Sequence, residues 1–202
     1  PSAKGSSNYV TRAYPFGIKA NASEGEFFKV LGTKEGATGY ELVLAHYPDG
    51  EIIPAGTPYI FKAVNDAAIQ DIYLEIVDDM GGTISTLDAL TYDLSSKTSN
   101  GLVSVLKDTK PGAGRGKIVD NKVLLTAESD LFLGNSAYLF DVQPTTEAGD
   151  AVIPMEALVT GINSAVIVNG VAPTATFDLQ GRRVAKTQKG LYIINGQKVL
   201  VK

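Results

Sequence analysis

The sequence predicts an all-β protein, with an antiparallel, jelly-roll-like β-sandwich as its main body and a small all-β module after it. Short stretches of alternating apolar and polar residues recur along the chain, and turn residues separate them. No window of more than about ten residues has the periodicity of a helix. The composition agrees, because 21 glycines and nine prolines among 202 residues leave little room for long helices.

Strand candidates fill the first 160 residues. The clearest hairpin joins residues 117–119 to 122–125 through the turn Asp120-Asn121. Further strands are expected at residues 40–47, 51–53, 59–64, 69–77, 138–142 and 152–159. We expect the large apolar side chains of these strands to lie in the core, and they are Tyr59, Phe61, Ile72, Leu74, Tyr138 and Phe140.

A joint between two domains is expected at residues 160–164, where the sequence TGINS separates two groups of strand candidates. We therefore divide the chain into a β-sandwich domain at residues 1–160 and a C-terminal β module at residues 161–202. The second part has room for about four short strands.

Formal charge also divides unevenly along the chain. Residues 1–178 hold 12 Lys and Arg against 22 Asp and Glu, a net charge of −10, whereas residues 179–202 hold six Lys and Arg and no acid, a net charge of +6. A basic patch can bind nucleic acid, but this patch is small and the acidic body would repel phosphate. We expect no nucleic-acid partner, and no transmembrane segment because no apolar run approaches ~20 residues.

Residues 190–202 predict an ordered hairpin. Both residues of the turn Asn195-Gly196 accept positive φ angles. Pairing across this turn gives four opposed pairs, the first two on one face and the last two on the other: Tyr192 with Val199, Ile194 with Gln197, Leu191 with Leu200, and Ile193 with Lys198.

The C-terminal segment also carries a recognisable pattern in residues 177–184 (FDLQGRRV), in residues 189–193 (KGLYI), and in Lys198-Val199 with Lys202. On these residues it resembles the C-terminal sorting domain of the type IX (Por) secretion system, which occurs on secreted and surface proteins of the Bacteroidetes. The family pattern is a strand that ends in a D-L-x-G-R-x-V turn, a G-x-Y strand, and a last strand with lysines. The stretch IIPAGTPYIF at residues 52–61 resembles a sequence motif common in uncharacterised surface proteins of the same bacteria.

The resemblance implies that the protein is secreted or attached to the outer membrane at the cell surface, with secretion machinery as a partner of its tail. It implies nine motif residues in the tail: Asp178, Leu179, Gly181, Arg182, Gly190, Tyr192, Gly196, Lys198 and Lys202. Among them we expect Gly190 and Tyr192 to position the strand. We expect Lys198 and Lys202 to supply the charges that an acidic partner recognises.

Several kinds of catalytic site are excluded by residue type. The chain has no cysteine, which excludes a disulfide framework, a thiolate zinc site and a cysteine nucleophile. A histidine-based zinc site needs several histidines, and the chain has only His46. A Ser-His-Asp triad would have to use this same residue. Residues 134–138 (GNSAY) lack the second glycine of a nucleophile elbow and the helix that should follow. We therefore expect no enzymatic activity and no cofactor.

Two further loops resemble ligand sites at first sight. Residues 111–117 (PGAGRGK) resemble a phosphate-binding loop, but that pattern requires glycine at Pro111 and Ser or Thr at Ile118, so we interpret them as a mobile hairpin loop. Five aspartates could hold calcium, but no loop has a ligand at every second position, and solvated turns are favoured. These aspartates are Asp49, Asp66, Asp71, Asp78 and Asp79.

The function expected from the sequence is that of a non-catalytic interaction or structural module, with a protein or glycan ligand as a possible partner in adhesion. The alternative is a carbohydrate-binding module attached to a glycan-degrading enzyme, which a row of two or three exposed aromatic rings would favour. Candidates for that row are Tyr9, Tyr14, Phe16, Tyr40, Tyr47 and Tyr59. A glycosidase would instead need two facing carboxylates ~5–10 Å apart in a cleft.

Overall fold

The computed structural model describes residues 8–37, 39–63, 73–78, 81–84, 92 and 94–159, together with the backbone of four short strands between residues 176 and 201. The chain divides into two compact units, residues 1–163 and residues 164–202. We call them the body and the C-terminal unit, and each is described by itself. The division lies three residues beyond the boundary placed from the sequence, which was at residue 160.

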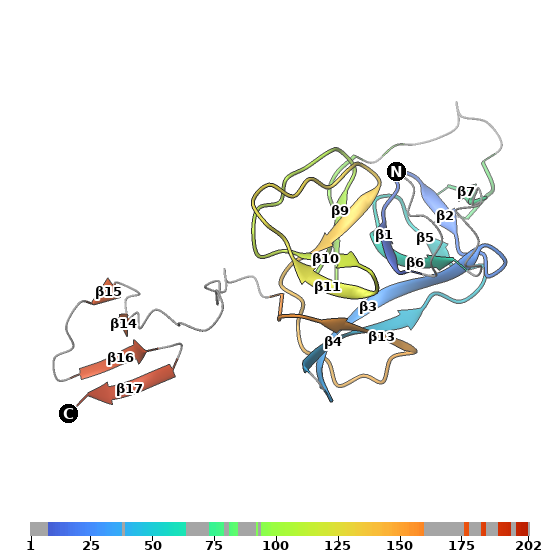
Figure 1. Cartoon of the computed structure of the whole chain (residues 1–202). Helices are drawn as coiled ribbons and strands as arrows, with labels where there is room; N and C mark the ends of the chain where they lie inside the picture. The colour runs from blue at the N-terminus through green and yellow to red at the C-terminus, as the bar shows by residue number, and fades with distance from the viewer. Residues whose placement is uncertain are drawn as a thin grey trace. The chain divides into compact units, whose positions relative to one another are not determined.

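Every regular element among the described residues is a β-strand, which confirms the all-β, sandwich-like class (Figure 1). Within the described part of the body the strands are β1 (Val10–Arg12), β2 (Gly17–Lys19), β3 (Gly25–Gly36), β4 (Gly39–His46), β5 (Ile52–Ile53), β6 (Tyr59–Ala63), β7 (Glu75–Val77), β8 (Thr98–Ser99), β9 (Leu102–Val105), β10 (Gly116–Val119), β11 (Lys122–Leu125), β12 (Ser136–Leu139) and β13 (Ala151–Met155).

The strands of the body form two sheets. Ten of them make one sheet in the order β1-β6-β3-β4-β13-β11-β10-β12-β9-β8, and three make a second sheet in the order β5-β2-β7. Neighbouring strands are antiparallel except β11 and β13, which run parallel with Val123 opposite Met155. The large sheet is therefore mixed, and the expectation of purely antiparallel sheets is wrong at this pair. The reason is that the chain leaves β11, forms β12 on the far side of β10, and returns to place β13 between β11 and β4.

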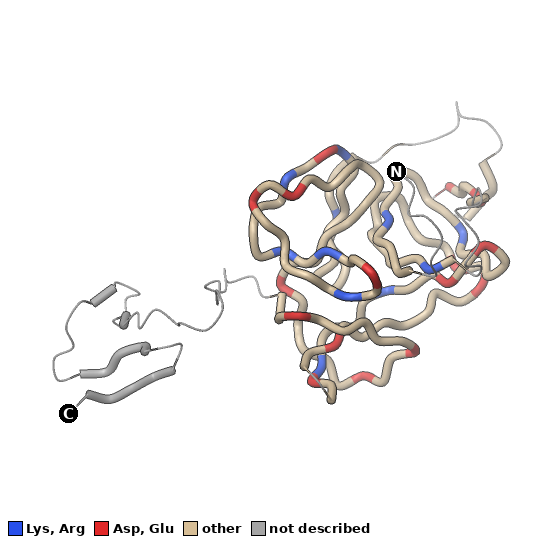
Figure 2. The backbone as a smooth tube through the Cα atoms, in the orientation of Figure 1, with Lys and Arg blue, Asp and Glu red and all other residues tan. Residues whose placement is uncertain are grey.

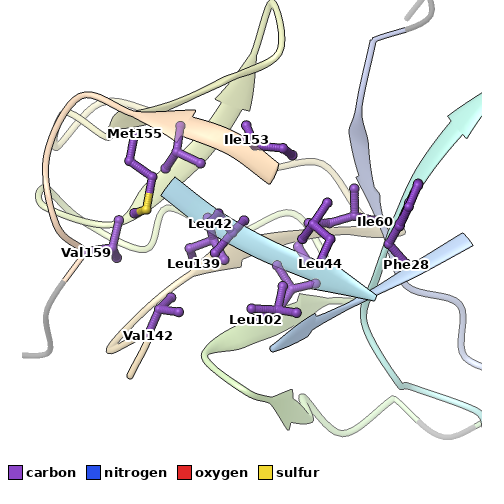
Figure 3. Close-up of a cluster of buried hydrophobic side chains, with 13 residues drawn as sticks. Phe28, Leu42, Leu44, Ile60, Leu102, Leu139, Val142, Ile153, Met155 and Val159 are labelled. Atoms are coloured by element: carbon purple, nitrogen blue, oxygen red, sulfur yellow. The ribbon is translucent and has the colours of Figure 1, made fainter. Parts of the chain in front are cut away.

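The adjacent strands β3 and β6 separate two hydrophobic cores. Phe28 lies opposite Ile60 and both belong to the larger core, whereas Phe27 lies opposite Phe61 and both belong to the smaller core. The larger core also holds Val30, Leu42, Leu44, Leu102, Val123, Ala137, Leu139, Val142, Ile153, Met155 and Val159 (Figure 3). The smaller core is completed by Ile18, Ala20, Ile53 and Tyr59, so the three-stranded sheet contributes through β2 and β5. Each core thus depends on one side of the same strand pair.

The large sheet bends round the larger core until β1 meets β12. The hydroxyl of Thr11 donates a hydrogen bond to the carbonyl of Ala137 at 2.7 Å and accepts one from the backbone N–H of Ala137 at 3.1 Å. The backbone N–H of Ala13 donates to the carbonyl of Asn135 at 3.4 Å. Because unpaired buried backbone groups are costly, one threonine hydroxyl that serves both groups of Ala137 closes the sheet in place of a regular ladder.

The hairpin predicted around Asp120-Asn121 is confirmed. Strands β10 and β11 pair with Val119 opposite Lys122, and the two residues between them have φ angles of +48° and +60°. Two successive left-handed residues are the mark of a type I′ turn, whose twist matches that of paired strands. Asp and Asn adopt this conformation more readily than most other residues with side chains.

The longest strand, β3, is not predicted from the sequence. It lies between the two cores and buries residues on both faces, so its residues do not alternate between apolar and polar. It is also interrupted by a register shift between Val30 and Gly32. A Cβ atom on Gly32 would lie 2.5 Å from the carbonyl oxygen of Gln143, and Gly32 has a φ of +150°, so the close approach of the two segments requires glycine.

The core predicted from the sequence is correct at two positions. Tyr59 and Phe61 are buried, with 1% and 3% of their surface exposed, whereas Leu74 is half-buried against the smaller core. Ile72 and the rest of residues 69–72 lie outside the described residues, and β7 covers only the end of the strand predicted there.

The prediction that Tyr138 and Phe140 lie in the core is wrong, because the residues of β12 that face the core are shifted by one position from those predicted. Ala137 and Leu139 are fully buried, whereas the two aromatic residues are half-buried on the other face. The ring of Tyr138 packs edge-on against Phe132, and the guanidinium carbon of Arg115 lies 3.9 Å from the centre of the Phe140 ring. A large ring on an outward face is thus covered by its neighbours rather than by the core.

The burial of Leu139, but not of Phe140, in the larger core gives a direct prediction for stability. Leu139→Ala should lower the free energy of unfolding by about 2–5 kcal/mol, because it leaves a cavity in the larger core. Phe140→Ala should cost less, since its ring is half-buried and leaves no internal cavity. Urea denaturation of both variants measures the difference, and a larger loss for Phe140→Ala than for Leu139→Ala would contradict the phase described here.

Candidate functional site

The C-terminal unit contains a four-stranded sheet in the order β15-β14-β16-β17 (Figure 1). Its strands are β14 (Thr176–Phe177), β15 (Arg183–Val184), β16 (Gly190–Ile194) and β17 (Gln197–Val201). Three predicted motif residues lie in these strands, with Gly190 and Tyr192 in β16 and Lys198 in β17. The other six lie outside the described residues: Asp178, Leu179, Gly181, Arg182, Gly196 and Lys202.

The pairing predicted for the last hairpin is confirmed residue by residue. The four predicted pairs are present between β16 and β17, and a fifth pair joins Gly190 to Val201. A two-residue connection and a side-chain period of two fix this register, since a slip of one residue would exchange the faces of the strand. The hairpin therefore follows from local sequence alone.

The first part of the resemblance also spans two paired strands. Phe177 at the start of the stretch FDLQGRRV lies opposite Arg183 near its end, and Thr176 lies opposite Val184. Residues 177–184 thus leave one strand and return beside it. On its other side β14 pairs with β16, where Phe177 lies opposite Ile193. The three matched stretches therefore belong to one sheet.

A second candidate site lies on the body, around the one histidine of the chain. The His46 ring lies between two carboxylates, with Nε2 3.3 Å from Glu26 Oε1 and Nδ1 3.3 Å from Asp150 Oδ2. The backbone N–H of His46 also donates to Asp150 Oδ2 at 2.8 Å, and Lys62 Nζ lies 3.2 Å from Glu26 Oε2. Phe28 packs under the imidazole with its ring centre 4.3 Å away. Three segments distant in sequence are joined at this point.

The electrostatics of this cluster favour ionised carboxylates. Partial burial of Glu26 opposes ionisation, but hydrogen bonds from Lys62 and His46 outweigh it and hold the pKa of Glu26 below its ordinary value. The backbone N–H of His46 is the main reason that the pKa of Asp150 is also lowered. The side chains of His46, Glu26 and Asp150 are 42%, 41% and 53% exposed. Solvent therefore screens these ion pairs, and each stabilises the fold only modestly.

The arrangement around His46 does not resemble a hydrolytic triad. Both ring nitrogens face carboxylates, and among the described residues no Ser or Thr hydroxyl is hydrogen-bonded to the ring. Ser136, the serine of the GNSAY stretch, donates its hydroxyl to the carbonyl of Leu133 at 2.5 Å. A hollow of about 90 Å³ lies beside His46, between residues 20–27 and 46–49, and its volume is well below the 300–1,000 Å³ of ordinary ligand pockets. The cluster is thus built as a link between strands.

The glycine-rich loop at residues 111–117, which was interpreted as a mobile hairpin loop, is hydrogen-bonded to Thr126 at several points. The buried hydroxyl of Thr126 donates to the carbonyl of Gly112 at 2.7 Å and accepts from the backbone N–H of Arg115 at 2.9 Å. The backbone N–H of Gly114 donates to the carbonyl of Thr126 at 3.0 Å. Lys117 pairs with Asp130 at 2.6 Å, which lowers the pKa of that carboxyl. The lysine of the phosphate-loop pattern is therefore already engaged.

Aspartates of the described turns bind backbone groups. Asp49 accepts from the backbone N–H of Ala22 at 2.8 Å, and Asp78 accepts from that of Gly82 at 2.7 Å. Within the described ranges, no group of three or more His, Asp and Glu side chains is placed to hold a metal ion. Asp66, Asp71 and Asp79 lie outside those ranges.

The candidate aromatic residues do not line up as an exposed row in the described part of the chain. Tyr14 and Phe16 stack on each other with ring centres 5.4 Å apart, and Tyr59 is buried. Lys62 lies over the ring of Tyr9, and Lys29 lies over the ring of Tyr47. Tyr40 is exposed, and two aromatic residues that were not named as candidates, Tyr73 and Tyr92, are also exposed.

Neither Glu26 nor Asp150 has a direct signal in the sequence. Glu26 lies in β3, which was not predicted, and Asp150 follows a loop before β13, 104 residues from His46. Strand pairing brings them together, because β4 lies between β3 and β13. Only the position of His46 within a strand was predicted, at residues 40–47, and it lies at the end of β4.

Comparisons with known proteins identify no relative of this chain. A scan against models of protein families finds no match, and searches of curated proteins and of solved structures find no similar chain. In the part of the chain that the structure describes, no helix is long and apolar enough to cross a membrane.

The carboxylates around His46 give a prediction for pH dependence. Because the pKa values of Glu26 and Asp150 are lowered on folding, their stabilisation is fully present above their ordinary pKa values of 4.5 and 3.8. It is lost as the pH falls through the lower values of the folded state. A Glu26→Gln, Asp150→Asn variant should therefore lose less stability than the wild type between about pH 6 and pH 3.

Urea denaturation across that pH range measures the effect. Glu147→Gln is the matched control, because Glu147 is exposed and none of the described ion pairs includes it. The control should follow the wild type. A double variant that loses stability as steeply as the wild type would show that these two carboxylates do not contribute.

Proposed function

We propose that this chain is a non-catalytic interaction or structural module of a secreted or cell-surface protein, and that its C-terminal unit is a sorting tail for a type IX secretion system. One observation carries the proposal. Described residues of all three stretches that resemble the sorting domain lie in one sheet, and the second and third stretches pair as a hairpin in the register that the sequence predicts. A signal that is read by a folded receptor needs such a defined surface.

The separation of the tail from the body supports the same proposal. All ladders of β14 to β17 are made within the C-terminal unit, and the described strands of the body pair only with one another. The two parts also differ in charge, since all six charged residues of the segment 179–202 are basic. Acidic and basic residues are instead interspersed along the backbone of the body (Figure 2). A basic sheet attached to an acidic body can be recognised through charge without involving the body.

A non-catalytic role for the body is supported by what its ionisable groups do. The ring of the one histidine lies between two carboxylates, and the lysine of the phosphate-like loop is paired with Asp130. The body would then be the exported cargo, placed at the outer surface of a Bacteroidetes-type cell, where it binds a protein or a glycan. The tail would interact with the secretion machinery.

Deletion of residues 190–202 tests the proposed function in a Bacteroidetes host with a type IX secretion system. The truncated protein should keep a folded body, because β16 and β17 pair with no described strand of the body. It should accumulate inside the cell envelope, whereas the full chain should reach the surface. Surface protease digestion and fractionation measure location, and circular dichroism of the purified protein measures folding.

A Lys198→Ala, Lys202→Ala variant is the matched point-mutant form of this test. If the tail is a sorting signal, this variant should also be retained, because its ammonium groups are the charges offered to an acidic receptor. Normal surface delivery of both the deletion and the double variant would refute a sorting role. A truncated protein that unfolds, together with normal delivery of the double variant, would show that the hairpin serves only the fold.

A further inference from the structure

The order of the C-terminal sheet leaves β17 with one partner among the described strands. Its five residues, Gln197–Val201, all pair with β16, and its other side is the edge of the sheet. The opposite edge is β15, which has only two residues. An edge of five extended residues presents unpaired N–H and C=O groups, and such an edge can accept another strand.

The two-residue connection decides which backbone groups of β17 point outward. The residues that flank such a turn, Ile194 and Gln197, form a pair that exchanges backbone hydrogen bonds. In an antiparallel ladder, hydrogen-bonded and non-hydrogen-bonded pairs alternate. Gln197, Val199 and Val201 therefore bond to β16. The N–H and C=O groups of Lys198 and Leu200 face the free edge.

The pairing of β16 with β14 agrees with this assignment of hydrogen-bonded and outward-facing residues in β17. If Lys198 does not bond to β16, then Ile193 opposite it must direct its own N–H and C=O to the other side. That side is occupied by β14, in which Phe177 lies opposite Ile193. The backbone groups of Ile193 thus have a partner strand, and those of Lys198 have none among the described strands.

Charge decides which occupant suits this edge. A second copy of β17 would bring Lys198 against the same basic strand, and lysine on an edge strand acts against self-pairing. Strand β17 contains Lys198 and no acidic residue, and Lys202 follows it in the sequence, so the charge of this strand favours an acidic partner strand.

We propose that the free edge of β17 is the docking surface of the tail, and that it takes an acidic, extended segment of the export machinery by strand addition through the backbone groups of Lys198 and Leu200. The inference rests on the proposed sorting function, for which it names the surface and the chemistry of the partner. Backbone pairing would supply the affinity, and the basic side chains would select the acidic partner.

Proline substitutions at neighbouring positions test this surface in the full chain. Leu200→Pro removes an N–H that faces the free edge, and proline is tolerated where the N–H of an edge strand faces solvent. Val199→Pro removes an N–H that bonds to β16 and should disrupt the hairpin. Leu200→Ala is the matched control for Leu200→Pro, because it loses the same side chain but keeps the N–H.

In the type IX host, Leu200→Pro should reach the cell surface about tenfold less than Leu200→Ala, because the incoming strand is left with an unpaired carbonyl. Amide hydrogen exchange of the purified proteins should show protected amides at 199 and 201 in both variants. In the wild type, the amides of 198 and 200 should exchange much faster than those of 199 and 201. If the amides of 199 and 201 lose their protection in Leu200→Pro, the backbone groups of Leu200 do not face the free edge, and the inference is overturned.

The outcomes separate the docking surface from the sorting function. If deletion of residues 190–202 leaves export unchanged, the sorting function itself fails. If the deletion blocks export but Leu200→Pro is exported like Leu200→Ala, the tail sorts through another surface and only the inference is overturned. Lys198→Glu should reduce export more than Lys198→Gln, and equal export of the two would overturn the acidic partner.

Discussion

The body depends on one constraint, which is that β3 and β6 must bury both of their faces. Phe27 and Phe61 face the smaller core while Phe28 and Ile60, their neighbours in the chain, face the larger one. A strand pair that is apolar on both sides cannot be left at a surface, so it needs a layer on each side. The three-stranded sheet contributes to the core on one side, and the bent remainder of the ten-stranded sheet packs on the other. The ladders around β3 and β6 therefore decide where all other strands of the body lie.

The same constraint explains which elements could be predicted from the sequence. The β10–β11 hairpin and the β16–β17 hairpin are local, and each follows from a two-residue turn between alternating residues. β3 has no such signal, because a strand buried on both faces has no alternation to detect. Tyr59-Ile60-Phe61 and Tyr138-Leu139-Phe140 look alike in sequence, yet only the first has its aromatic rings buried. The difference is that β6 lies between two cores and β12 lies beside one, which is a property of the topology.

The candidate sites divide in the same way. The residues of the tail were found because their pattern is contiguous and their pairing is local. The His46 cluster was not found, because Glu26 and Asp150 reach His46 only through the neighbours of β4 in the sheet, β3 and β13. Nothing in the local sequence of either carboxylate predicts this contact. The parallel placement of β13 beside β11 is a long-range feature of the same kind, and short alternating strands do not reveal it.

The independence of the two units matters for how the protein can be studied and for how such a tail can evolve. No described ladder joins the two units, so we expect the effects of substitutions in the tail sheet and in the cores around β3 and β6 to add. If the C-terminal unit is a sorting tail, as proposed, a sheet formed by pairing within that unit would be transferable to other cargo proteins. If the receptor is acidic, as proposed, the basic tail would complement its charge and the acidic body would not. Under the proposed function, the division into two units would separate the exported cargo from the segment that the secretion machinery recognises.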